Sequence, residues 1–157
     1  MTAKPDISLH IVDPQDADAL YCLTEYYAEL GRRFKTGFDV SLSRDPDADA
    51  LRPPVGAFLI AKFNDTPIGC AGLKGDGGAI AEVKRVWVAP TARGLGLGRQ
   101  MMTRIEAQAR TLNITTLRLD TNTALPEAIT MYKSFGWTEI PRYNDDPYAQ
   151  VFFEKRL

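Results

Sequence analysis

The stretch TARGLGLGRQ, residues 91–100, has a glycine at every second position and an arginine on either side of its three glycines. Glycine loses more conformational entropy on folding than any other residue, so this density needs a reason. The stretch follows the valine-rich segment VKRVWVAP, residues 83–90, which is typical of a strand buried on both sides, and it precedes a helical spacing of apolar residues. We therefore predict a turn that leads from a strand into a helix.

The glycines of this turn predict a binding site for an anion. The first amides of a helix point outward without internal partners, at the positive end of the helix dipole. Without side chains, Gly94, Gly96 and Gly98 let a phosphate lie directly on these amides, and Arg93 and Arg99 add positive charge. The alternative, a tight turn that binds nothing, gives no reason for alternate glycines between arginines.

Two common phosphate-binding motifs do not match the turn. A P-loop requires GxxxxGK followed by Ser or Thr, which the chain lacks. The dinucleotide fingerprint requires GxGxxG, but the sixth residue is Arg99 when counted from Gly94 and Met101 when counted from Gly96. The turn therefore belongs to another class of phosphate site.

Apolar periodicity extends the prediction along the whole chain. Helices are expected over 14–33, 96–112 and 126–135, and strands over 7–12, 55–63, 67–74, 79–88, 115–120, 137–140 and 150–155. The first helix is expected to have Asp13 as its N-cap and Pro14 at its first position. The segment 35–54 is irregular apart from a helical patch near 47–51, and it is either a cover over the site or a long connection.

This order of elements predicts an α/β fold with one mixed sheet and helices on both faces. The three strands between 55 and 88 form a meander, and the strand, helix and strand between 79 and 120 form a right-handed crossover. No internal repeat or low-complexity tract divides the chain, so residues 1–157 are predicted to form a single domain.

The composition excludes several classes of protein. Of the 157 residues, 45% are hydrophobic and 25% are charged, which is typical of soluble globular proteins. The 19 Lys and Arg against 20 Asp and Glu lack the basic excess of a sequence-independent nucleic-acid binder. The N-terminal stretch lacks the apolar core of a signal peptide, and no run of about 18 apolar residues predicts a membrane span. No nucleic-acid or membrane partner is expected.

The cysteines and the single histidine narrow the chemistry. Cys22 and Cys70 lack CxxC spacing, so no disulfide framework or zinc site is expected, and a cytoplasmic location follows by default. His10 is the only histidine and lies in a predicted strand, which argues against Ser-His-Asp or Cys-His catalysis. No metal is expected, and neither cysteine is assigned a catalytic task.

The pattern Arg-x-x-Gly-x-Gly, from Arg93 through Gly96 to Gly98, together with VKRVWVAP before it, resembles the pyrophosphate-binding loop of the GNAT family of N-acetyltransferases. The sequence EAITMYKSFGW, residues 127–137, is similar to the family's helix that carries a tyrosine before a Gly-aromatic pair. The likeness is most specific over 82–137, and GRRFKTGFD and NDDPYAQVFFEK resemble a bacterial subgroup of unassigned substrate. It implies an acyl-CoA N-acyltransferase fold with a central, mostly antiparallel sheet.

The resemblance also implies acetyl-CoA as co-substrate and the residues that bind it. In the family, the pyrophosphate lies on the glycine loop, and the pantetheine arm pairs with a strand that splays from its neighbour. The binding residues are thus expected to be Val86, Trp87, Val88, Arg93, Gly94, Gly96, Gly98, Arg99 and Asn122. Leu125 stands where many members carry an Asn that touches the pantetheine arm, and Asn122 is the expected substitute. Trp87 itself is expected in the core or the pocket wall.

Acetyl transfer to an amine needs three aids. The amine must lose a proton, the carbonyl oxygen must be polarised, and the leaving thiolate must be stabilised or protonated. The resemblance implies Glu82 as the base, backbone N–H groups near Trp87 and Val88 for the carbonyl, and Tyr132 as the proton donor. The alternatives are a Glu82 that is solvated or paired with Lys84 or Arg85, and a Tyr132 that only packs in the core.

The acceptor pocket is expected near the first helix. The resemblance places there Tyr26, Tyr27, Phe34, Phe38 and Asp39, most of which are also expected in the core. The segment YNDDPY, residues 143–148, is expected to close the far side, and its carboxylates either attract an amine or only solvate a turn.

Three functions are compatible with these features. The first is an N-acetyltransferase that moves an acetyl group directly from acetyl-CoA to a primary amine of a small molecule. The second is a non-catalytic acyl-CoA-binding regulatory module, against which Glu82 and Tyr132 argue. The third is an acetyltransferase for a protein N-terminus or lysine, which would need an open groove. A homodimer is compatible with all three.

Overall fold

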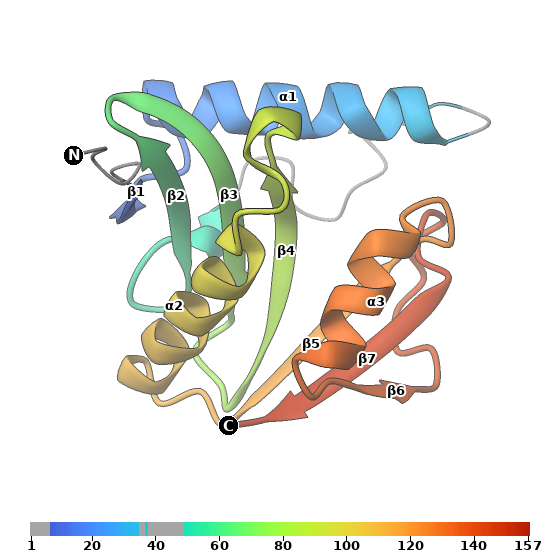
Figure 1. Ribbon diagram of the computed structural model, residues 1–157. Coiled ribbons are helices and arrows are strands. Elements are labelled where there is room, and N and C mark those ends of the chain that lie inside the picture. Colours follow the sequence, from blue (N-terminus) through green and yellow to red (C-terminus); the bar gives the residue numbers. More distant parts are fainter. Residues whose placement is uncertain (1–6, 35–36, 38–48) are drawn as a thin grey trace.

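The computed structural model describes residues 7–34, 37 and 49–157 (Figure 1). The strands are β1 (Ile7–Val12), β2 (Ala57–Phe63), β3 (Thr66–Lys74), β4 (Ile80–Val88), β5 (Thr116–Thr121), β6 (Thr138–Ile140) and β7 (Val151–Arg156). The helices are α1 (Ala17–Arg33), α2 (Leu97–Thr111) and α3 (Pro126–Ser134), with the short 3₁₀ turns η2 (Asp49–Leu51) and η3 (Pro90–Ala92). This order confirms the predicted succession of elements.

The seven strands form one sheet in the order β1-β2-β3-β4-β5-β7-β6. Only β4 and β5 are parallel, and all other neighbouring strands are antiparallel. The predicted mixed and mostly antiparallel sheet is thus confirmed, and the β2-β3-β4 meander lies at its centre.

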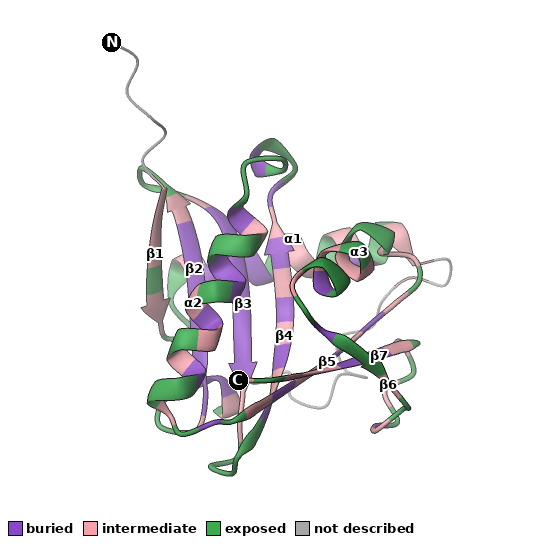
Figure 2. Cartoon of the chain, turned by 60° about the horizontal axis from the view of Figure 1, so that its bottom comes forward, coloured by how far each residue is buried: buried purple, intermediate pink, exposed green. Residues whose placement is uncertain are grey.

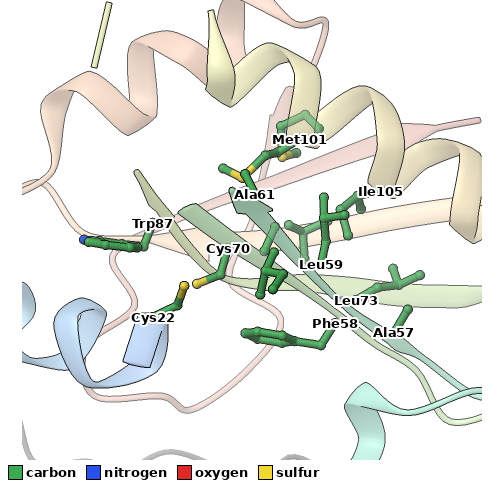
Figure 3. Close-up of a cluster of buried hydrophobic side chains, with 14 of the residues drawn as sticks. Cys22, Ala57, Phe58, Leu59, Ala61, Cys70, Leu73, Trp87, Met101 and Ile105 are labelled. Carbon is green, nitrogen blue, oxygen red and sulfur yellow. The ribbon is translucent and has the colours of Figure 1, made fainter. Parts of the chain in front are cut away.

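Helices cover the two faces of the sheet at its centre. The α2 residues Met101 and Ile105 are fully buried and pack over β2 and β3 (Figure 3). On the opposite face, Cys22 of α1 packs against Cys70 of β3 (Figure 3). Figure 2 shows the buried residues concentrated on the central strands. Burial of each such apolar side chain stabilises the fold by about 1.5–3 kcal/mol.

The start of α1 differs from the prediction. The helix begins at Ala17 with Asp16 as N-cap, and the side chain of Asp13 instead accepts a hydrogen bond from the Gln15 amide at 2.8 Å. A backbone bond from Asp16 N to Asp13 O (3.0 Å) closes a turn before the helix. Asp13 also pairs with Arg52 at 2.9 Å, so its carboxylate links this turn to a distant segment.

Strand β4 is irregular in a way that shapes the site. Arg85 has φ of 56°, and the register against β3 shifts there, since Cys70 lies opposite Trp87 but Gly72 lies opposite Lys84. Such a bulge bends the strand and increases its twist. Along β4, buried residues alternate with half-buried ones, so the prediction of burial on both sides was wrong. The half-buried positions include residues that line a cavity.

Candidate active site

A cavity of about 500 Å³ lies where β4 and β5 separate. The two strands pair only over Ile80–Glu82 and Thr116–Arg118, and then diverge toward α1 (Figure 1). The cavity is lined by α1, β4, the loop before α2, the end of β5, α3, and the segment before β7. The splayed strand that the resemblance implied is therefore present.

The glycine loop forms one wall of the cavity, and its glycines have different tasks. Gly94 and Gly96 have left-handed φ values of 82° and 75°, and a Cβ on either would meet no atom within 4 Å. Glycine suits them because of backbone conformation and open access from the cavity. A Cβ on Gly98 would lie 2.7 Å from Met131 Sδ, so this glycine lets α2 approach α3. Gly96 is also the N-cap of α2, which leaves the first helical amides at the cavity.

The two arginines of the loop line the cavity but already have partners. Arg93 donates from Nε to Val88 O at 3.3 Å and forms an ion pair with Glu29 of α1. The Arg99 guanidinium carbon lies 4.4 Å from the centroid of the Phe135 ring. These contacts hold the cations at the two ends of the loop.

The edge of β4 that faces β5 forms the next wall, with Val86, Trp87 and Val88 among its lining residues. The Ala89 amide bonds to Ile68 O of β3 at 2.8 Å. Because hydrogen-bonding groups alternate between the two sides of a strand, the Val88 amide points away from β3, toward the cavity. The Trp87 side chain is 4% exposed and packs in the core.

Tyr132 lies on α3 at the boundary between core and cavity. It is 5% exposed, its ring packs near Trp137 and Phe153, and it lines the cavity. Its hydroxyl makes no hydrogen bond to a described residue. Burial, with a smaller effect of the Asp120 charge, raises the pKa of Tyr132 above its ordinary value, so the phenol is protonated at neutral pH.

Glu82 lies at the last position of β4 that pairs with β5, and it is not among the residues that line the cavity. Its Oε2 accepts a hydrogen bond from the Tyr143 hydroxyl at 3.1 Å and lies 3.4 Å from Lys84 Nζ. Burial, then the charges of Glu82 and Asp120, raise the pKa of Tyr143. The structure therefore shows the pairing with Lys84 that sequence analysis offered as an alternative to a catalytic base.

Asn122 lines the cavity, and both the nitrogen and the oxygen of its side-chain amide form hydrogen bonds to the backbone. Its Nδ2 donates to Tyr148 O at 2.9 Å, and its Oδ1 accepts from the Ala124 amide at 2.8 Å. This arrangement shapes the turn that leads from β5 into α3. Leu125, at the position where many family members carry Asn, also lines the cavity.

Some of the residues that were predicted to form the acceptor pocket line the cavity. Tyr26 and Tyr27 of α1 and its C-cap residue Phe34 line the cavity. Phe38, Asp39 and most of the segment 35–54 lie outside the described residues. The ring of Phe34 stacks on Tyr148 with 5.5 Å between centroids. Of the segment 143–148, Asp146 and Tyr148 line the cavity.

Sequence analysis missed a charged group on the floor of the cavity. Asp120, which is 12% exposed, and Lys84 both line it, and their Oδ2 and Nζ atoms are 3.2 Å apart. One signal was available: Asp120 lies at the carboxyl end of the strand that is parallel to β4, where ligands of open sheets commonly bind. Among the described residues, no group of His, Cys, Asp or Glu is arranged to hold a metal ion. No helix in those ranges is long and apolar enough to cross a membrane.

Comparisons with known proteins agree with this geometry. The model of the acetyltransferase (GNAT) family matches residues 23–137. A protein of Azospirillum brasilense named IAA acetyltransferase is 36% identical over 115 residues, which cover 71% of this chain and 74% of the relative. The chain therefore belongs to the GNAT family of acetyltransferases.

Two solved structures share the fold. A GNAT-family acetyltransferase from Staphylococcus aureus matches with a TM-score of 0.82 at 17% identity, over 96% of this chain and 99% of that one. A GNAT-family acetyltransferase from Elizabethkingia anophelis, solved with acetyl-CoA bound, matches with a TM-score of 0.66 at 16% identity, over 98% and 100%. Both matches show that this chain shares their fold.

Proposed function

We propose that the protein transfers an acetyl group from acetyl-CoA directly to a primary amine of a small molecule. The observation that carries this proposal is that three features line one cavity: the glycine loop, the part of β4 that does not pair with β5, and Tyr132. The loop offers helix amides to a pyrophosphate, and the β4 edge offers backbone groups to an amide-bearing arm. This combination suits a long thioester donor.

The reaction follows from the placement of these groups. The amine nitrogen attacks the thioester carbonyl carbon, the Val88 amide stabilises the charge that develops on the carbonyl oxygen, and the C–S bond breaks. The Tyr132 hydroxyl donates to the departing thiolate. Glu82 takes the proton of the amine; because Glu82 does not line the cavity, a water carries that proton.

A small acceptor is favoured by contacts that cross the cavity. Arg33 at the end of α1 pairs with both carboxylate oxygens of Glu127 on α3, one of them at 2.9 Å. The stacked rings of Phe34 and Tyr148 lie beside this ion pair on the acceptor side. A protein substrate would need an open groove here, and these contacts narrow it.

A panel of primary amines tests the proposal. The protein is mixed with acetyl-CoA and each amine, and both the released thiol and the acetylated amine are measured. We expect equal amounts of the two products for at least one small amine, and a much lower rate with lysine-containing peptides. Binding of acetyl-CoA without any acetylated product would favour the regulatory module, and preference for a peptide would favour a protein acetyltransferase.

A further inference from the structure

The carboxylate of Asp120 is held in one orientation by two neighbours. Its Oδ2 accepts from Lys84 Nζ at 3.2 Å and from Asn144 Nδ2 at 2.8 Å. Its Oδ1 has no hydrogen-bond partner among the described residues, although Asp120 lines the cavity. Both donors therefore fix one oxygen and leave the other available to a molecule that enters.

Three segments supply this group. Lys84 comes from β4, Asp120 from the end of β5, and Asn144 from the segment before β7. Asn144 is itself 9% exposed and its Oδ1 accepts from the Asp146 amide at 3.0 Å, so a loop hydrogen bond orients it. The Lys84 and Asp120 side chains are 21% and 12% exposed, so these mutually supporting partners differ from a set of solvated surface charges.

Lys84 lies among several carboxylates beside the cavity. Lys84 is faced by the carboxylates of Asp120, Glu82 and Asp146. Burial alone lowers the pKa of Lys84, but the Asp120 and Glu82 charges outweigh burial and raise it, so Lys84 is a permanent cation at neutral pH. Lys74 and Arg85 also line the cavity, so its net charge alone does not select a cation, and selection falls to the open Oδ1 of Asp120.

We propose that Asp120 Oδ1 receives the protonated amine of the acceptor, with Lys84 and Asn144 as positioning residues. This inference rests on the proposed function, because it assigns the amine its place in the same cavity. It selects alkylamines, which carry a positive charge near pH 8 because their pKa is about 10. Arylamines of similar size are neutral at that pH and gain nothing from Asp120.

Asp120→Asn tests the assignment because it keeps the shape and removes the charge. Initial rates are measured at pH 8 with saturating acetyl-CoA, for a matched alkylamine and arylamine from the panel. We expect kcat/KM for the alkylamine to fall about tenfold or more through a higher KM, the size of a lost charge-assisted hydrogen bond. The arylamine rate should change little. An equal loss for both amines, or no loss for either, would overturn the inference.

Two further variants separate this role from others. Glu154→Gln removes a carboxylate that pairs with Arg118 at 2.9 Å outside the cavity, and it should leave both rates unchanged. Glu82→Gln should lower kcat rather than raise KM for the amine, and its defect should shrink as pH rises, because more of the amine arrives deprotonated. If Asp120→Asn does not fold, Asn144→Ala should raise the alkylamine KM selectively.

Failure of the proposed function would look different. If no amine of the panel is acetylated by the parent protein, transfer to a small amine is refuted, and the inference is then decided by binding alone. Saturation-transfer NMR with the same alkylamines should show binding to the parent and at least a tenfold weaker signal response with Asp120→Asn, as expected for loss of a charged partner. No alkylamine binding to the parent would refute the assignment of Asp120.

Discussion

Replacement of Gly96 by glutamate is expected to reduce acetyl-CoA binding by about 100-fold or more, since charge-assisted hydrogen bonds contribute about 1.5–3 kcal/mol each. The residue is the N-cap of α2, has a φ of 75°, and faces open space where a Cβ would meet nothing. A glutamate here adds backbone strain, fills the space next to the helix amides, and puts negative charge at an anion site. Isothermal titration calorimetry with acetyl-CoA measures the change.

Two controls divide this effect into its parts. Gly96→Ala adds only the strain of a left-handed backbone, so it should weaken binding less than Gly96→Glu. Leu95→Glu places the same charge on a neighbouring side chain that is 50% exposed and does not line the cavity. Leu95→Glu should therefore weaken acetyl-CoA binding less than Gly96→Glu. If Gly96→Glu remains folded by circular dichroism and binds acetyl-CoA as the parent does, the glycine loop is not the pyrophosphate site.

Tyr132→Phe is expected to lower kcat by about 100-fold or more, the usual contribution of one general acid. The ring of Tyr132 packs near Trp137 and Phe153, and phenylalanine preserves this packing. Acetyl-CoA affinity should therefore change little. Rapid-mixing measurements of thiol release at saturating substrates report kcat, and calorimetry reports donor affinity.

The pH profile adds a second criterion for Tyr132. Its raised pKa keeps the phenol protonated through neutral and mildly alkaline pH. The parent enzyme should thus show no loss of kcat from phenol ionisation between about pH 7 and pH 10, the ordinary pKa of a tyrosine. Phe135→Leu serves as a control, because the Phe135 ring contacts Arg99 of the glycine loop. This variant should weaken acetyl-CoA binding and leave kcat at saturating acetyl-CoA nearly unchanged. A Tyr132→Phe enzyme with full kcat would assign this residue to the core alone.

The fold could be predicted because its signals are local. Alternating valines, helical spacing and turn residues gave the order of strands and helices, and the glycine loop was expected at the start of α2. Boundaries were less certain where two caps compete: Asp13 and Asp16 are both suitable, and the contact with Arg52 commits Asp13 to the turn. That contact joins residues far apart in sequence, so local pattern could not reveal it.

The site was harder to predict because its groups meet only after folding. Gly98 looked like Gly94 and Gly96 in sequence, but Met131 of α3 gives it a separate reason to be glycine. Both polar atoms of the Asn122 side chain form hydrogen bonds to the backbone, which the position of Asn122 in the sequence did not indicate. The group around Asp120 required the placement of the segment before β7, and no periodicity encodes that placement.

The central claim is that the cavity between β4 and β5 holds acetyl-CoA for transfer, and a crystal structure of the complex with acetyl-CoA tests it most directly. The account predicts the pyrophosphate on the amides at Gly96 and the start of α2, the pantetheine arm along β4 near Val88, and the thioester sulfur within hydrogen-bond reach of Tyr132 Oη. Acetyl-CoA bound elsewhere, or a thioester sulfur out of reach of Tyr132, would contradict it.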